Sequence, residues 1–140
     1  MKIEAKADKE MVENAVGAEN YDYLAEPPEI DAPTHHPLWP LMKKGLKEIY
    51  DPEIPVNVYE LGLIYRVDIK PPENGVSDVE VHMTLTSPAC PVAQEMPGWV
   101  QGAILPIEGV GGVTVEIIWE PKWNPSYMAE TAKMQLNMFM

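Results

Sequence analysis

Two segments of alternating hydrophobic residues, separated by a short turn, constrain the fold of this chain more than any other feature. Apolar side chains recur at every second position in residues 63–70 and again in residues 78–86, as in strands with one buried face. The residues expected on the buried faces are Leu63, Tyr65, Val67 and Ile69 in the first segment and Val79, Val81, Met83 and Leu85 in the second. Between the segments, Asn74-Gly75 favours a tight turn. The sequence therefore predicts an antiparallel hairpin.

The other periodic segments predict the remaining elements of one domain. Helical spacing predicts helices over residues 38–50, 91–105 and 126–138, a turn occupies residues 109–112, and alternation predicts a third strand over residues 113–120. The second helix contains Pro97 and Gly98, so we expect either a kink there or a later start. Ser126 is a candidate cap of the last helix. The order α-β-β-α-β-α predicts a compact two-layer α/β (α+β) domain, with a small mixed sheet and helices mostly on one face.

The N-terminal part of the chain differs in composition from this domain. Its first 33 residues carry nine acidic side chains against three lysines and end in a proline-containing stretch. Such a segment buries little apolar surface, so residues 1–35 are expected to form an acidic, flexible arm, with the domain over residues 36–140. The residues before about Pro33 are expected to be dispensable for folding. The alternative is a docking arm for a basic partner. If the arm packs on the domain, we expect Tyr21, Tyr23 and Leu24 to make the contact.

Charge and cysteine content narrow the classes of function. The net charge of −12 disfavours binding to nucleic acid and to an anionic membrane surface. One cysteine cannot form an intrachain disulfide. The N-terminus has neither a signal-peptide nor a transit-peptide pattern, and no apolar run reaches the roughly 18 residues of a membrane span. We therefore expect a cytoplasmic protein.

Cys90 is the first candidate for a functional side chain. It lies in Ser87-Pro88-Ala89-Cys90-Pro91, directly before the predicted second helix, with Pro91 at the first helical position. The free N–H groups and positive end of a helix lower the pKa of a nearby thiol and enrich the thiolate, which attacks electrophiles and binds metals. The sequence thus predicts a partly exposed thiol at a helix N-terminus. The alternative is a buried, inert cysteine.

Acids and hydroxyls form two further candidate groups. Asp51 and Glu53 flank a proline after the first predicted helix, where they could orient a metal, polarise a thiol or contact a partner; the alternative is a helix stop with two solvated acids. Thr86 and Ser87 precede the cysteine and could donate hydrogen bonds to a thiolate, although both residue types are also common where strands end.

Other side chains give weaker signals. His35 and His36 lie in the linker, His82 lies on a strand, and none is spaced with Cys90 as a zinc pair would be. One cysteine cannot complete a cysteine-rich metal site, so a cluster would need other ligands, a second protomer or a partner. Phosphate-loop, Rossmann and nucleophile-elbow motifs are not found in the sequence.

Aromatic residues follow the third predicted strand. Trp119, Trp123 and Tyr127 are expected to cap the sheet and core. The alternative is a surface that binds a partner.

Taken together, these segments resemble a known family. Residues 46–68, LKEIYDPEIPVNVYELGLIYRVD, resemble the signature of the family shared by SufT and the phenylacetate-degradation protein PaaD. The segment MTLTSPACP from Met83 is similar to the cysteine segment of that family, and residues 115–139 resemble the ending of SufT in particular. PaaD-like members tend to carry a further Cys-rich segment, which does not follow here, so the SufT type is expected.

The resemblance implies a compact α/β fold and a role in the maturation of iron–sulfur proteins. It carries the functional positions of the family over to Asp51, Glu53, Thr86, Ser87 and Cys90. Two mild departures are Ser87, where many relatives have Thr or Ala, and Glu60, which replaces a common Asp. The resemblance does not extend to the acidic arm.

We therefore expect a non-enzymatic accessory factor in iron–sulfur cluster assembly that acts through Cys90, with Asp51 and Glu53 nearby. No tightly bound cofactor is expected, only transient iron or an iron–sulfur cluster with Cys90 as a ligand. The expected partners are iron–sulfur assembly proteins and apo client proteins, with a homodimer as a further option. The alternatives are a thiol-dependent enzyme, a PaaD-like factor that matures a multicomponent oxygenase, and an adaptor whose cysteine only packs.

Overall fold

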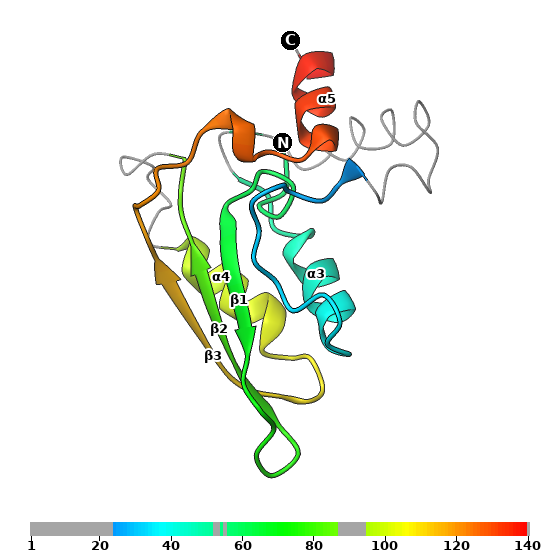
Figure 1. Cartoon of the computed structure of the whole chain (residues 1–140), viewed down its shortest axis with the longest axis vertical. Coiled ribbons are helices and arrows are strands. Elements are labelled where there is room, and N and C mark those ends of the chain that lie inside the picture. Colours follow the sequence, from blue (N-terminus) through cyan, green and yellow to red (C-terminus); the bar gives the residue numbers. More distant parts are fainter. Residues whose placement is uncertain (1–23, 52–53, 55, 87–94, 140) are drawn as a thin grey trace.

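The predicted element order is the observed one. The computed structural model describes residues 24–51, 54, 56–86 and 95–139 (Figure 1). Its elements are α3 (Trp39–Leu46), β1 (Ile64–Ile69), β2 (Ser77–Met83), α4 (Met96–Ile104), β3 (Val110–Ile117), the short 3-10 helix η1 (Pro125–Tyr127) and α5 (Glu130–Phe139). Within the described residues, three α-helices and a three-stranded mixed sheet in the order α-β-β-α-β-α confirm the predicted fold class. No described helix is both long and apolar enough to cross a bilayer.

The sheet has the order β1-β2-β3, and its two strand pairs differ in direction. β1 and β2 are antiparallel, as the hairpin prediction requires. In their turn, Asn74 has φ 55° and Gly75 has φ 82°, which is the conformation that Asn-Gly favours. β3 lies parallel to β2, so the chain must cross from one end of the sheet to the other between them, and α4 lies on this crossover.

Two helices cover one face of the sheet. α4 packs against β3, and α3 packs against α4, so both lie on the same side of the strands (Figure 1). The side chains of β2 and its extension that were predicted to face the core are all buried: Val79, Val81, Met83 and Leu85. Together with apolar residues of α3, α4 and β1 they form one core cluster.

The predicted face of β1 is wrong at Tyr65. Ile64 pairs with Met83 and Arg66 pairs with His82, so β1 carries one more residue than β2 across this step. Such a β-bulge reverses the alternation, and Ile64 is therefore buried in the core. The Tyr65 hydroxyl instead donates to the Pro121 carbonyl oxygen at 2.8 Å, outside the core.

The first two predicted helices are shorter than expected. α3 ends at Leu46 rather than at residue 50, because Glu48 and Ile49 form tighter turns through hydrogen bonds to Gly45 and Leu46. α4 begins at Met96 with Pro97 in its first turn, which confirms the expected later start and shows that Pro91 is not the first residue of this helix.

The observed first residues of the third strand and of the last helix also differ from the predicted ones. β3 starts at Val110, which pairs with Ser77, so the predicted turn at residues 109–112 is largely strand. α5 starts at Glu130, after η1. Ser126 does not cap it: the Ser126 N–H donates to the side chain of Asn124, the residue that caps η1.

The described part of the predicted arm contacts the domain. Ala25 is fully buried, and the Glu26 carboxylate contacts Lys43 and the Tyr59 hydroxyl. The backbone of Asp31 pairs with β1: its N–H donates to the Tyr65 carbonyl at 3.0 Å, and its carbonyl accepts from the Val67 N–H at 2.9 Å. Contacts with the domain therefore begin well before residue 36.

Of the residues expected to make that contact, Leu24 is half-buried. Tyr21 and Tyr23 lie outside the described residues, and the flexibility of residues 1–23 stays a prediction.

A buried carboxyl group joins the loop before β1 to α5. Glu60 is fully buried, and its oxygens accept hydrogen bonds from the Asn57 amide at 2.6 Å, the Thr131 hydroxyl and the Gln135 amide at 3.4 Å. The Glu60 carbonyl also accepts from the Ala129 N–H at 2.8 Å. Because a buried polar group without partners is strongly destabilising, these donors fix the position of α5 on the loop.

The segment between β3 and α5 closes over the same loop. The Trp123 indole N–H donates to the Leu61 carbonyl at 2.8 Å, and Trp123 packs against the core, as predicted for a capping residue. Trp119 is 46% exposed, so the capping prediction is wrong for this side chain. Gly62 has φ +78°, and a Cβ atom there would lie 2.2 Å from the Tyr127 carbonyl oxygen.

Substitution of Gly62 by alanine should therefore destabilise the fold. We expect Gly62→Ala to lower the free energy of unfolding by about 1–3 kcal/mol, since it combines a left-handed backbone with a clash against main chain. Gly102→Ala is the matched control, because a Cβ at Gly102 meets nothing within 4 Å. This control should be neutral or stabilising by up to about 1 kcal/mol, as in other helices. Urea denaturation of both variants measures the difference, and equal stabilities would contradict the close packing at Gly62.

Removal of the packed N-terminal segment should also cost stability. We compare a chain that starts at Leu24 with one that starts at Thr34. The shorter chain loses the burial of Ala25, the Glu26 contacts and the two backbone hydrogen bonds of Asp31. We expect its melting temperature to be lower by roughly 5 °C or more. Equal melting temperatures would show that residues 24–33 do not contribute to the stability of the domain.

Candidate functional site

The flanks of the two predicted motif segments meet at one cavity. It has a volume of about 290 Å³, and its described lining residues are Glu48, Ile49, Tyr50 and Trp99. The first three directly precede Asp51, whereas Trp99 lies on α4, the helix that follows the cysteine segment. The packing of α3 on α4 thus brings together regions that are far apart in the sequence.

The acidic motif begins in a loop that is closed at its base. Tyr50 forms an antiparallel bridge with Asn57, and the Val58 N–H donates to the Ile49 carbonyl at 2.8 Å. Within the loop the Asp51 N–H donates to the Val56 carbonyl at 3.3 Å. These bonds close the loop between Tyr50 and Val58, with Asp51 inside it.

Asp51 has a clear structural role in this loop. Its side chain is buried, and its Oδ1 atom accepts a hydrogen bond from the Ile54 N–H at 3.0 Å. This is a local side-chain turn of the type that Asp forms readily. The alternative interpretation of Asp51 as a solvated acid after a helix is therefore wrong, because the carboxylate is buried and organises the loop. Glu53 lies outside the described residues.

The cysteine segment begins where β2 ends. The Thr84 N–H donates to the Leu63 carbonyl at 2.8 Å, and Thr84 and Leu85 are buried. Thr86 is half-buried. Ser87 and Cys90 lie outside the described residues, so the exposure of the thiol and its distance from Asp51 stay predictions.

Glu48 and Tyr50 are the ionisable side chains among the described lining residues, and Tyr50 has a shifted pKa. Burial raises the pKa of its phenol, and the Glu60 and Glu48 carboxylates raise this pKa further. The phenol therefore stays protonated at neutral pH and can donate a hydrogen bond. No histidine or lysine is among the described lining residues. The described part of the cavity offers hydrogen bonding and aromatic contact, without a strong general base.

Sequence reasoning did not identify Tyr50 and Trp99 as site residues. Tyr50 directly precedes the acidic motif, and Trp99 is 40% exposed on a helix whose other large apolar residues are mostly buried. A large exposed aromatic side chain next to a motif is a usable signal for a binding surface. What the sequence lacked was the helix contact that brings the two residues to one cavity.

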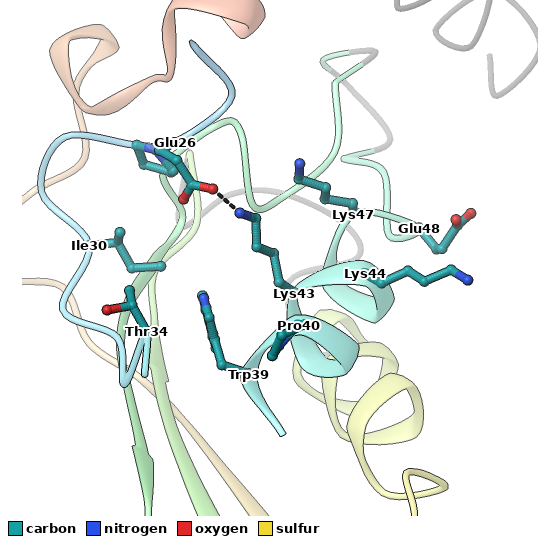
Figure 2. A pocket seen from close by; sticks show the side chains of 10 residues that line it. Glu26, Ile30, Thr34, Trp39, Pro40, Lys43, Lys44, Lys47 and Glu48 are labelled. Atoms are coloured by element: carbon teal, nitrogen blue, oxygen red, sulfur yellow. Dashed lines mark hydrogen bonds and ion pairs between the residues drawn. The ribbon is translucent and has the colours of Figure 1, made fainter. Parts of the chain in front are cut away.

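A larger groove lies between the N-terminal segment and α3 (Figure 2). Its volume is about 930 Å³, and Lys43, Lys44 and Lys47 lie along its helical side. Lys43 points across the groove to Glu26 (Figure 2). None of the described site residues predicted from the sequence lines either hollow, but Tyr50 and Trp99, which flank the two motifs, line the smaller cavity and not this groove. Size alone therefore does not make this groove the functional site.

Comparison with known families identifies the domain. The iron–sulfur cluster assembly protein family matches residues 43–117, a range that contains the acidic loop, the whole hairpin and the cysteine segment. More than half of the chain is thus covered by the match.

Curated bacterial relatives agree with this match. An Fe–S protein maturation auxiliary factor of Porphyromonas gingivalis is 45% identical over 91 residues, which cover 65% of this chain and 83% of the relative. The factor YitW of Bacillus subtilis is 36% identical over 67% of this chain and 88% of the relative. The factor SufT of Staphylococcus aureus is 32% identical over 64% of this chain and 98% of the relative.

Solved structures show the same fold. A domain of unknown function from Bacillus anthracis has a TM-score of 0.59 at 30% identity, covering 69% of this chain and 89% of that chain. A conserved hypothetical protein from Thermotoga maritima has a TM-score of 0.56 at 33% identity, covering 72% and 93%. With both motif segments inside the matched range and near-complete coverage of these relatives, the chain belongs to the iron–sulfur cluster assembly protein family.

Proposed function

We propose that this protein is an accessory factor in the maturation of iron–sulfur proteins and that it works through the thiol of Cys90. The observation that carries the proposal is the family match across residues 43–117, which includes both the acidic loop and the cysteine segment. Relatives at 32–45% identity are named Fe–S protein maturation auxiliary factors, and one of them is SufT. The convergence of the motif flanks at one cavity supports a single site.

The thiol suits a transient role with iron or a cluster. Iron–sulfur clusters are held mainly by cysteine thiolates, usually four of them. This chain has a single cysteine, so Cys90 would share its metal or cluster with ligands from an assembly protein, an apo client or a second copy of the chain. A shared ligand set favours transfer over storage. We therefore propose a carrier or client-binding step without turnover of a substrate.

The loop that begins at Asp51 would support the thiol. Its base is closed by the Tyr50–Asn57 bridge, and Asp51 holds the backbone of Ile54. Groups around a ligand tune its affinity, and Asp51 and Glu53 would act on the thiol in this way. Thr86 and Ser87 would supply hydroxyl donors to the thiolate or its ligand.

Replacement of the thiol should abolish function and leave the fold intact. Serine does not ionise near neutral pH and is a poor ligand for iron, whereas it nearly preserves size. In cells that lack the native protein, we expect Cys90→Ser not to restore the activity of iron–sulfur enzymes. The free energy of unfolding of the variant should differ from that of the wild type by no more than about 1 kcal/mol. Thr114→Ser, an exposed substitution on β3, is the control and should restore activity fully.

Anaerobic reconstitution separates the carrier step from other uses of the thiol. Iron and sulfide are added to the wild type and to Cys90→Ser, and absorption and iron content are measured. Iron or cluster uptake that depends on Cys90 supports the carrier proposal. Full rescue of cells by Cys90→Ser would refute it and leave an adaptor role.

Asp51→Asn tests whether the charge of Asp51 has a role beyond the loop. The asparagine side-chain oxygen can still accept from the Ile54 N–H, so the loop should be preserved. We expect a partial loss of activity in the same cells, smaller than that of Cys90→Ser, at nearly unchanged stability. Asp51→Ala, which removes the acceptor, should lower stability by about 1 kcal/mol or more. Full activity of Asp51→Asn would show that the role of this residue is structural.

A further inference from the structure

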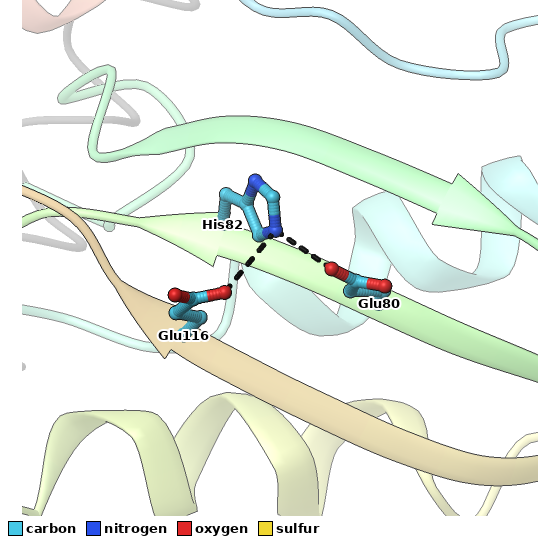
Figure 3. A group of neighbouring side chains, drawn as sticks. All are labelled: Glu80, His82 and Glu116. Atoms are coloured by element: carbon cyan, nitrogen blue, oxygen red, sulfur yellow. Dashed lines mark hydrogen bonds and ion pairs between the residues drawn. The ribbon is translucent and has the colours of Figure 1, made fainter.

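Three metal-ligating side chains converge on the face of the sheet opposite α3 and α4. Along β2, Val79, Val81 and Met83 are buried under the helices, so Glu80 and His82 project from the other face. In the parallel pairing of β2 and β3, His82 lies directly beside Glu116. Figure 3 shows the two carboxylates pointing toward the imidazole from either side. The strand register thus creates the cluster.

The distances within the cluster fit one metal ion. His82 Nε2 lies 2.8 Å from Glu80 Oε1 and 3.5 Å from Glu116 Oε2, and the three ligand atoms lie within 4.8 Å of one another. A first-row metal binds such atoms at about 2.0–2.2 Å, which places neighbouring ligands roughly 3–3.5 Å apart. Only small side-chain rotations would therefore bring all three atoms onto one ion.

An ion pair between His82 and one carboxylate does not explain why a second carboxylate lies beside the same ring nitrogen. The Nε2 atom can donate only one hydrogen bond, yet it faces two carboxylates. Lys70 Nζ lies 3.6 Å from Glu80 Oε2 and compensates part of the charge, whereas Arg66, the neighbour of His82 across β1, is paired with Asp68. A divalent cation would neutralise both carboxylates at once, in a chain whose net charge is −12.

The donor atoms of the cluster narrow the kind of ion that would fit, because they are one imidazole nitrogen and two carboxylate oxygens. Imidazole nitrogen with carboxylate oxygen is a donor set typical of zinc, iron and manganese rather than of calcium.

We propose that Glu80, His82 and Glu116 form a binding site for a divalent transition-metal ion, separate from Cys90. The side chain of His82 is 26% exposed and that of Glu116 is 62% exposed, so an ion there would keep open positions toward solvent. Such a site favours exchange of the ion over permanent structural binding. The proposal rests on the geometry of the sheet and is independent of the thiol.

Metal titration of the full chain tests this site. Zn²⁺ is added to the metal-free protein at neutral pH in a calorimeter, and Co²⁺ absorption reports the coordination. We expect Glu116→Gln and His82→Asn each to weaken binding at least tenfold. Glu108→Gln, an exposed acid outside the cluster, and His35→Asn should bind as the wild type does. Circular dichroism verifies folding, and Glu116→Gln keeps the test valid if His82→Asn is unstable.

Cys90→Ser distinguishes this site from the proposed thiol site. Binding that survives Cys90→Ser but not Glu116→Gln supports the metal site, whatever the outcome of the cell experiments. Binding that is lost in Cys90→Ser and kept in both cluster variants overturns it. Absence of Zn²⁺ binding, or equal affinity in the wild type and both cluster variants, also overturns it and leaves the cluster as an ion pair.

Discussion

The hydrogen bonds of the buried Glu60 carboxyl group are the interaction on which the end of the domain that carries the acidic loop depends. It takes donors from its own loop through Asn57 and from α5 through Thr131 and Gln135. A carboxyl group removed from water requires such hydrogen-bond partners. Movement of either α5 or the loop would therefore expose the Glu60 carboxyl group to solvent or leave it buried without partners. Because the same loop leads from Asp51 into β1, the position of the acidic motif is coupled to a helix at the far end of the sequence.

Elements with one uniformly buried face could be predicted from the sequence. Features that depend on contacts with other elements of the fold could not. β2 alternates cleanly because one face lies under the helices, and its prediction is confirmed. The bulge at Tyr65 depends on the step between Ile64 and Arg66 against β2, which no local pattern records. The early end of α3 also depends on a contact with another segment, because Tyr50 pairs with Asn57 instead of continuing the helix.

The two candidate sites show the same contrast. The acidic loop and the cysteine segment were identified from sequence motifs, whereas the approach of their flanking residues Tyr50 and Trp99 to one cavity follows from helix packing. His82 gave a weak signal in the sequence because its partner Glu116 lies on a strand beyond a whole helix. Only the parallel register places them side by side. A metal centre on a sheet face is thus encoded by strand order, and the proposed thiol site by linear motifs.

The direction of the three strands gives the domain two unequal ends. β1 begins, and β2 and β3 finish, at the same end of the sheet (Figure 1). The acidic loop, Thr84–Thr86 and the tail from Ile118 therefore all leave the sheet there, whereas the opposite end carries the Asn74-Gly75 turn. A fluorophore or an immobilisation tag attached at this turn would leave the end of the sheet that carries the acidic loop and Thr84–Thr86 accessible. Labels for single-molecule experiments on this protein should therefore be attached at the hairpin turn.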